Sequence, residues 1–225
     1  LVEQLAKDGH KIIVLDNFST GRRKNLDNLK NKIKLIKCNL HIKGNWEKFF
    51  KNIDWVFHLA ALADIVPSIE NPKAYFLSNV NATYNVLEAS RKNKIKKIVY
   101  SASSSCYGIP QNYPTNENEE IKTEYPYSLT KYLAEQLILH WNKVYNLKSI
   151  SLRFFNVYGP KARTSGTYGA VLGVFLAQKL ANKPFTVVGD GTQTRDFTFV
   201  SDVVDAMISA AKSKINNEVI NIGSS

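Results

Sequence analysis

Two residues with acid–base potential lie four positions apart in the segment YSLTK, residues 127–131. A helix predicted over 127–146 places Tyr127 and Lys131 on the same face. An ordinary tyrosine has a pKa of about 10 and is a poor base at neutral pH. A neighbouring ammonium favours the phenolate and so lowers that pKa. The pair predicts general acid–base chemistry, although this spacing also arises by chance in many helices.

A hydroxyl-rich segment makes this interpretation more specific. SASSSCYG at 101–108 continues from the predicted strand KIVYSAS at 97–103. Ligands of open α/β sheets bind at the carboxyl ends of the strands, and Ser103 stands at such an end. We expect Ser103 to hydrogen-bond a substrate hydroxyl and the Tyr127 phenol, which orients both groups.

Six β-rich apolar runs alternate with segments of helical spacing, and the clearest helices are predicted over 72–93 and 127–146. This alternation predicts an α/β fold, a Rossmann-type doubly wound parallel sheet with helices on both faces. The near-continuous apolar runs agree with strands that are buried on both faces. The predicted strands are 11–16, 34–39, 54–60, 97–103, 149–154 and 218–223.

Asp16 ends the first predicted strand, where a dinucleotide-binding fold carries an acid for the ribose hydroxyls. The glycine-rich phosphate turn of that fold lies about 20 residues earlier, so we expect it before Leu1. An anion at this position repels a 2′-phosphate, which favours NAD over NADP. Arg22 and Arg23 leave NADP open, and an aspartate after a strand is also a common turn former.

The segment HLAA at 58–61 ends another predicted strand with small residues. Small side chains let the backbone approach a cofactor closely, whereas His58 itself is expected to be structural. A positively charged nicotinamide beside Tyr127 would favour the phenolate further.

The regular alternation breaks between residues 161 and 200. KARTSGTYG is loop-like, GAVLGVFLAQKLA is helical, and the stretch to Val200 is rich in turn signals. We predict an NAD-binding domain over 1–160, part of a small substrate-binding region over 161–200, and a return to the sheet over 201–225. We also expect further sequence at both ends, because the first ten residues match the middle and end of a helix and NIGSS directly follows a strand.

The composition is that of a globular protein with a strong positive charge. Of 225 residues, 44% are hydrophobic, and no apolar stretch is long enough to span a bilayer. The net charge of +11 fits either an anionic partner or a lysine-rich solvated surface. The lysines form no long basic block, so we predict neither a nucleic-acid nor a membrane partner. Cys38 and Cys106 lack metal-ligand spacing and a disulfide pattern, which predicts no metal site and fits a reducing cytoplasm.

Taken in order, these motifs resemble the extended short-chain dehydrogenase/reductase family. The resemblance is to its NAD-dependent epimerase/dehydratase type, and most closely to nucleotide-sugar epimerases of the UDP-glucose 4-epimerase kind. It covers essentially the whole chain. The segments that carry it are Asp16, FHLAA, SASSSCYG, YSLTK, LRFFNVYGP and GDGTQTRDF.

The resemblance implies a role for each matching residue. Ser103, Tyr127 and Lys131 match the catalytic triad, and Lys131 also binds the nicotinamide ribose. Arg195 matches the arginine that holds the nucleotide phosphates, a task suited to its planar guanidinium. The implied NAD contacts are Asp16, Asn17, Asn39, Leu40, Leu59, Ala60, Ala61, Asn79, Tyr127, Lys131 and Phe154. The implied substrate contacts are Ser103, Asn156, Val171 and Arg195.

Some positions depart from the family pattern. Asn39 stands where the family usually has an adenine-binding Asp, Ala82 replaces a common Gly, and Cys106 replaces a typical Val. We expect these changes to be tolerated. The resemblance also implies a homodimer formed through the predicted helices at 72–93 and 127–146.

The reaction follows from what the active site lacks. Family dehydratases carry an Asp–Glu pair where this chain has Ser104 and Ser105, and related decarboxylases often keep the Glu. Epimerisation at C4 needs no such acid, so we predict 4-epimerisation of a UDP-hexose, or of its N-acetyl or uronic analogue, through a 4-keto sugar. The alternatives are another nucleotide-sugar enzyme (decarboxylase, dehydratase or reductase) and a non-catalytic protein that binds dinucleotide or nucleic acid.

Overall fold

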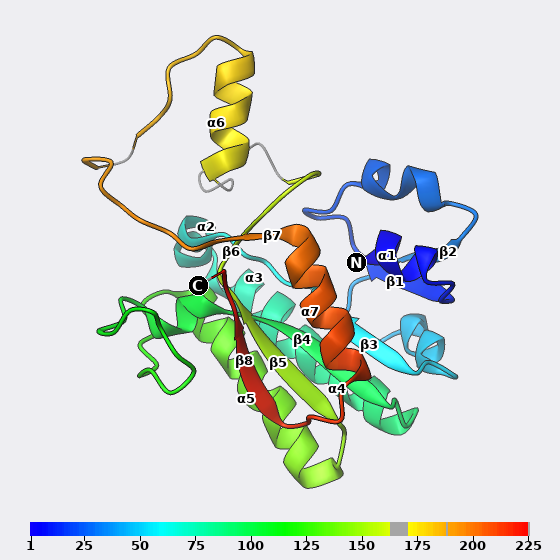
Figure 1. The fold of residues 1–225 in the computed structure, drawn as a ribbon. Coiled ribbons are helices and arrows are strands. Elements are labelled where there is room, and N and C mark those ends of the chain that lie inside the picture. The colour runs from blue at the N-terminus through cyan, green and yellow to red at the C-terminus, as the bar shows by residue number, and fades with distance from the viewer. Residues whose placement is uncertain (163–170, 188, 225) are drawn as a thin grey trace.

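A computed structural model describes residues 1–162, 171–187 and 189–224 (Figure 1). Every strand pairing is parallel, as predicted. The six predicted strands are confirmed as β1–β5 and β8, with each end shifted by two residues or fewer. The strands are β1 (Ile12–Asp16), β2 (Ile33–Lys37), β3 (Trp55–His58), β4 (Lys97–Ser103), β5 (Ser149–Phe154), β6 (Asn156–Tyr158), β7 (Phe197–Phe199) and β8 (Glu218–Ile222).

The strands form three hydrogen-bonded groups. The central sheet has the order β3-β4-β5-β8, while β1 pairs with β2, and β6 pairs with β7. The predicted parallel α/β fold is confirmed, with β1 and β2 as a pair that is not hydrogen-bonded to β3 within the described residues. The small β6–β7 pair was not predicted, because three-residue strands leave little periodic signal.

Helices cover both faces of the central sheet, as predicted (Figure 1). The α-helices are α1 (Val2–Lys7), α2 (Ile65–Glu70), α3 (Pro72–Tyr75), α4 (Ala82–Lys92), α5 (Pro126–Tyr145), α6 (Val171–Leu180) and α7 (Val200–Lys212). Three short 3₁₀ helices are η1 (Arg23–Leu29), η2 (Asn45–Phe50) and η4 (Ser104–Tyr107), and η3 (Phe76–Asn81) is a π-helix.

Two hydrophobic clusters hold these layers together. Ile98 and Tyr100 on β4 pack with Ala134 and Ile138 of α5, whereas Val99 between them packs with Met207 of α7 on the opposite face. Neighbouring strand residues point to opposite faces, so β4 is buried on both sides. This burial explains why its sequence is a continuous apolar run.

The predicted helix over 72–93 is interrupted. It begins at Pro72, where the Asn71 side chain accepts a hydrogen bond from the amide of Ala74, and it passes through the π-turn of η3 into α4. Such π-turns occur frequently at functional sites. This one carries Asn79, which lies behind the candidate site.

The predicted helix over 169–181 is confirmed as α6, but the loop-like prediction at 161–169 falls mainly on residues 163–170, which lie outside the described residues. Helix α6 stands apart from the central sheet (Figure 1), and none of its residues is buried. Within the described ranges, no helix has the length and apolar character needed to cross a membrane.

Candidate active site

The carboxyl ends of three neighbouring strands meet at one edge of the central sheet. Ser103 of β4 is in register with Phe154 of β5, which is in register with Ile222 of β8. Ligands of open α/β sheets bind at this edge. Ser103, which the sequence predicted at the end of a strand, therefore lies at the sheet edge where a ligand would bind.

A cluster of hydroxyl groups surrounds Tyr127. The Ser103 and Ser105 hydroxyl oxygens lie 2.8 Å apart, and the amide of Ser105 donates to the Ser103 hydroxyl at 3.2 Å. Both hydroxyls hydrogen-bond to the Tyr127 phenol. The structure thus brings Ser103 and Tyr127 together. Ser105 is an additional member that sequence reasoning treated only as a missing acid, although the run SASSS at 101–105 offered the signal.

The pKa of Tyr127 is raised above its ordinary value in this structure. Burial is the main cause, and the hydrogen bonds from Ser103 and Ser105 oppose it. The predicted lowering by Lys131 is not what the structure shows, because these two serines provide the leading contributions in that direction. The phenolate therefore depends on what else is bound beside it.

Lys131 is buried below Tyr127, one turn further along α5. Its ammonium donates to the carbonyl of Ser101 and lies 4.5 Å from the centre of the Tyr100 ring. Burial lowers the pKa of Lys131 to about 7, and the nearby Glu135 carboxylate opposes this change. A lysine in this range exchanges its charge near neutral pH, as groups at functional sites often do.

The start of α5 is fixed by local bonds. Pro126 occupies its first turn, and the hydroxyl of Ser128 accepts from the amide of Tyr125 and donates to its carbonyl. The Tyr75 ring lies edge-on to the Tyr127 ring, with the ring centres 6.5 Å apart. These contacts set the direction in which Tyr127 points.

Asn79 joins the start of α5 to the loop after β3. Its side-chain amide donates to the carbonyl of Leu62 and to the hydroxyl of Thr130, both at 3.0 Å, and its oxygen accepts from the amide of Leu62 at 2.8 Å. Asn79 is buried and both of its donors bind protein. Asn79 thereby holds the segment that precedes Asp64, and its predicted place among the cofactor contacts stays a prediction.

Asp16 lies at the end of β1 with its carboxylate facing a tight loop. One oxygen accepts from the amide of Phe18 at 2.6 Å, and a Cβ on Gly21 would lie 2.9 Å from the other. Glycine therefore lets this loop close over the carboxylate. Asn17 accepts from the amide of Ser19, and the Arg23 guanidinium lies over the Phe18 ring.

The other expected cofactor contacts fall into two groups. Leu59 and Ala60 are exposed after β3, and Ala61 is partly exposed, so their backbone is open to a ligand. Leu40 belongs to the hydrophobic cluster that includes α4 and α5, whereas Phe154 packs against the other cluster, which includes α7. Asn39 lies 3.4 Å from a ring nitrogen of His41. The side chain of Leu40 therefore packs in the core, and its backbone is the part that remains for a ligand.

His58 has the structural character expected of it. It is buried, and its Nε2 lies 2.8 Å from the hydroxyl of Thr83. Burial, followed by the charge of Lys131, lowers the pKa of His58 to about 3. The ring is neutral at physiological pH. Within the described residues, no group of three His, Cys, Asp or Glu side chains is placed to hold a metal ion.

Comparison with known proteins places the chain in a family. The profile described as the NAD dependent epimerase/dehydratase family matches residues 1–223. The chain belongs to this family.

Relatives with different products share the family fold. A UDP-N-acetyl-alpha-D-glucosaminuronate decarboxylase of Bacillus cytotoxicus is 35% identical over 100% of this chain and 70% of its own. The structure of a UDP-N-acetylglucosamine 4-epimerase of Methanobrevibacter ruminantium is 35% identical, with a TM-score of 0.94 over 99% of this chain and 71% of its own. A UDP-glucose 4-epimerase of Thermus thermophilus, solved with NAD, is 30% identical, with a TM-score of 0.90 over 99% and 73%.

The expected substrate contacts lie in the part of the chain from β6 to β7, residues 156–199, which we call the outer segment. Asn156 begins β6 opposite Phe197, and its side chain donates to the carbonyl of Asp196 at 3.1 Å. Arg195 is exposed and donates to the carbonyl of Thr194, while Val171 begins α6 and is 40% exposed. The structure brings Asn156 beside the segment of Arg195. Within the described residues, the side-chain hydrogen bonds of Asn156 and Arg195 run to backbone carbonyls of this same segment and not to the hydroxyl cluster at Tyr127.

Proposed function

We propose that this protein is an NAD-dependent nucleotide-sugar 4-epimerase. It interconverts UDP-glucose and UDP-galactose, or their N-acetyl or uronic analogues, through a 4-keto sugar. The observation that carries the proposal is the Ser103–Ser105–Tyr127 hydroxyl cluster above Lys131, at the carboxyl end of β4. A binding protein without catalytic function has no need of this arrangement.

The residues present suit most of a dinucleotide. The acceptor oxygens of Asp16 fit ribose hydroxyls, and the exposed backbone at Leu59 and Ala60 permits close approach. A G-x-G-x-x-G turn for the pyrophosphate does not occur in the sequence. The proposed contacts otherwise follow the family assignment: Asn17, Asn39, Leu40, Ala61, Asn79, Tyr127, Lys131 and Phe154, with Leu40 acting through its backbone and Asn79 through the loop that it holds.

Tyr127 handles the proton in the proposed reaction. Its phenolate oxygen takes the proton of the sugar 4-hydroxyl and later returns it to the 4-keto oxygen. Ser103 orients the sugar oxygen and the phenol, since its hydroxyl bonds to both. In the occupied site, the positive charge of Lys131 is proposed to add to the stabilisation of the phenolate that Ser103 and Ser105 provide in this structure. When bound beside Tyr127 and Lys131, NAD would supply reversible hydride chemistry at C4 and would be regenerated in each cycle.

The outer segment is proposed to hold the UDP-sugar. Asn156 and Arg195 would bind the diphosphate, and Val171 would line the sugar side. This assignment gives residues 1–160 to the NAD-binding domain, 161–200 to the substrate region and 201–225 to the sheet. We also propose a cytoplasmic location, which suits the two free thiols of Cys38 and Cys106.

The test is an assay of the protein with NAD and UDP-glucose. We expect UDP-galactose to form without accumulation of NADH. Because a decarboxylase is among the relatives, UDP-glucuronate is tested in parallel and its products are resolved by NMR. Ser104 and Ser105 stand at the positions where a dehydratase carries its acidic pair, so we expect a 4-epimer as the product. A pentose product or stoichiometric NADH would contradict the proposal.

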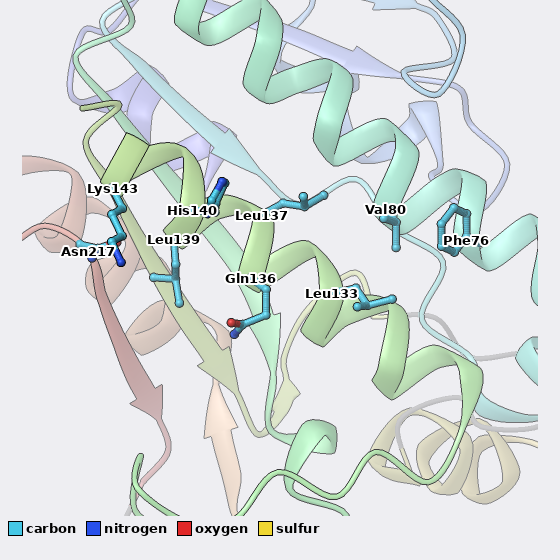
Figure 2. A pocket seen from close by; sticks show the side chains of 9 residues that line it. All are labelled: Phe76, Val80, Leu133, Gln136, Leu137, Leu139, His140, Lys143 and Asn217. Carbon is cyan, nitrogen blue, oxygen red and sulfur yellow. The ribbon is translucent and has the colours of Figure 1, made fainter. Parts of the chain in front are cut away.

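We further propose that the protein is a homodimer formed through α5 and η3. A shallow groove on this face is lined by apolar and polar side chains of both elements (Figure 2). Phe76 is 50% exposed and Leu129 is 44% exposed on the same face. A second copy would cover them. Light scattering should report a dimer that Leu133→Glu converts to a monomer, whereas Lys179→Glu on α6 leaves it dimeric; a wild-type monomer would refute the dimer.

A further inference from the structure

Glu135 is a buried carboxylate one helical turn beyond Lys131 on the inner face of α5. Only 1% of the residue is exposed. Its two oxygens accept from the Arg153 guanidinium at 2.6 and 3.1 Å, and one also accepts from the Ser151 hydroxyl at 2.8 Å. A two-point pair of this kind fixes the direction of a carboxylate. Glu135 is therefore held rigidly between α5 and β5.

The hydrogen-bond network of Glu135 extends through Arg153 to Tyr107, near Ser103. Arg153 donates to the Tyr107 phenol at 2.7 Å, and that phenol donates to the side-chain oxygen of Asn221 on β8 at 2.8 Å. Tyr107 ends η4, the short helix that begins directly after Ser103. One carboxylate thus anchors both the helix that carries Lys131 and the turn that carries Ser103.

The titratable groups near Lys131 differ in the charge that they carry. The titratable groups around it are Tyr100 on β4, whose ring centre lies 4.5 Å from the ammonium, Tyr127 and Glu135 one helical turn before and after it on α5, and His58 on β3. His58 is neutral, and burial raises the pKa of both tyrosines. Glu135 is the group among them that raises the pKa of Lys131.

We propose that Glu135 is a positioning residue whose carboxylate is the counter-charge that keeps Lys131 an ammonium beside Tyr127. Arg153 competes for this same carboxylate, since it pairs with both oxygens. Arg153 is paired directly with Glu135, whereas the Lys131 ammonium bonds to the Ser101 carbonyl and feels the carboxylate one helical turn away through its charge, so the charge on Arg153 limits the stabilisation that reaches Lys131. The inference rests on the proposed function, which gives Lys131 its role beside Tyr127.

The proton affinity of Lys131 is measurable without cofactor or substrate. The carbon-13 resonances of the lysine ε-carbons are followed over a pH series, and Lys131→Arg identifies the signal by its loss. Glu135→Gln should lower the titration midpoint of Lys131 by about one to three pH units. Arg153→Gln should raise it, because the carboxylate is then left to Lys131 alone. Ser151→Ala removes a bond to Glu135 but no charge, and should leave the midpoint in place.

A purely structural network predicts a different pattern. Each variant would then change thermal stability, measured by circular dichroism, while the midpoint of Lys131 stayed constant. An unchanged midpoint in folded Glu135→Gln or in folded Arg153→Gln would overturn the inference. Should Glu135→Gln not fold, Arg153→Gln carries the test alone, with its upward change. Because no substrate is present, failure here is separate from failure of the epimerase assay.

Discussion

Around Tyr127 the polar side chains are buried or partly buried and bonded to one another, whereas around Arg195 they are exposed and bonded mainly to nearby backbone. Lys131 and Glu135 are 4% and 1% exposed, and their partners come from β4 and β5. The guanidinium of Arg195 donates to the carbonyl of the preceding residue. The first region is held by the core, and the second is held by its own local turns.

The difference separates two tasks. Proton transfer needs atoms at fixed positions, and packed strands and helices supply them. Binding a UDP-sugar needs groups that can reach a ligand, and the exposed segment between β6 and β7 carries the candidates. Changes in the buried region should therefore affect the rate of reaction, and changes in the exposed region should affect substrate binding.

The largest effect is expected from Tyr127→Phe. The phenol hydroxyl is the proposed acid and base, so kcat should fall by about 10²- to 10⁴-fold with little change in KM. The fold should be retained, because the aromatic ring that packs against Tyr75 remains. Rates of 4-epimerisation measured for both proteins test this. A variant that keeps full activity would rule out the proposed mechanism.

Arg195→Ala tests the exposed region. Loss of a charge-assisted contact costs about 1.5–3 kcal/mol, so KM for the UDP-sugar should rise roughly ten- to a hundredfold while kcat changes little. Lys183→Ala removes an exposed cation from the same segment and serves as the matched control. If both variants behave alike, the segment attracts substrate only through its general positive charge.

The pH dependence should follow the buried lysine. Burial lowers the pKa of Lys131 to about 7, so the ammonium is present below that pH and is lost as the pH rises through it. We expect kcat/KM to fall above pH 7, by at most about tenfold per pH unit. A flat profile between pH 6 and 9 would contradict this.

The same lysine affects stability. Because its pKa is higher in the unfolded chain, burying the ammonium lowers the free energy of unfolding below pH 7, and this destabilisation fades as the pH rises above 7.

The smallest effect is expected at a partly exposed ion pair of α4, Glu88 with Arg91, beside Trp141 of α5. Glu88 accepts from Arg91 and from the Trp141 indole, and these bonds lower its pKa to about 2. Glu88→Gln should reduce thermal stability slightly at pH 7 and leave kcat unchanged. The folded pKa lies below the unfolded value, so the stability difference should shrink as the pH falls from 4.5 towards 2. A large loss of activity would show that the two faces of α5 are coupled.

The sequence predicted the strands of the central sheet well because their apolar runs are long and uninterrupted. Helix α5 was equally clear, beginning at Pro126 where residue 127 was expected. The π-turn of η3 was missed, since a one-residue change in helical pairing leaves the apolar pattern nearly intact. The pairing of β6 with β7 depends on contacts between residues some 40 positions apart, which local periodicity does not report.

The sequence by itself determined the α/β fold and placed the hydroxyl and aspartate candidates at strand ends and the lysine on a helix, because apolar periodicity and the order of elements along the chain can be read from local sequence. Only the tertiary structure showed that Ser105 joins Ser103 at the Tyr127 phenol, that Asn79 binds protein, and that Glu135 stands between Lys131 and Arg153. The physical reason is that burial and counter-charge depend on side chains brought together from β4, β5 and α5, and these set the charge that Tyr127 and Lys131 carry.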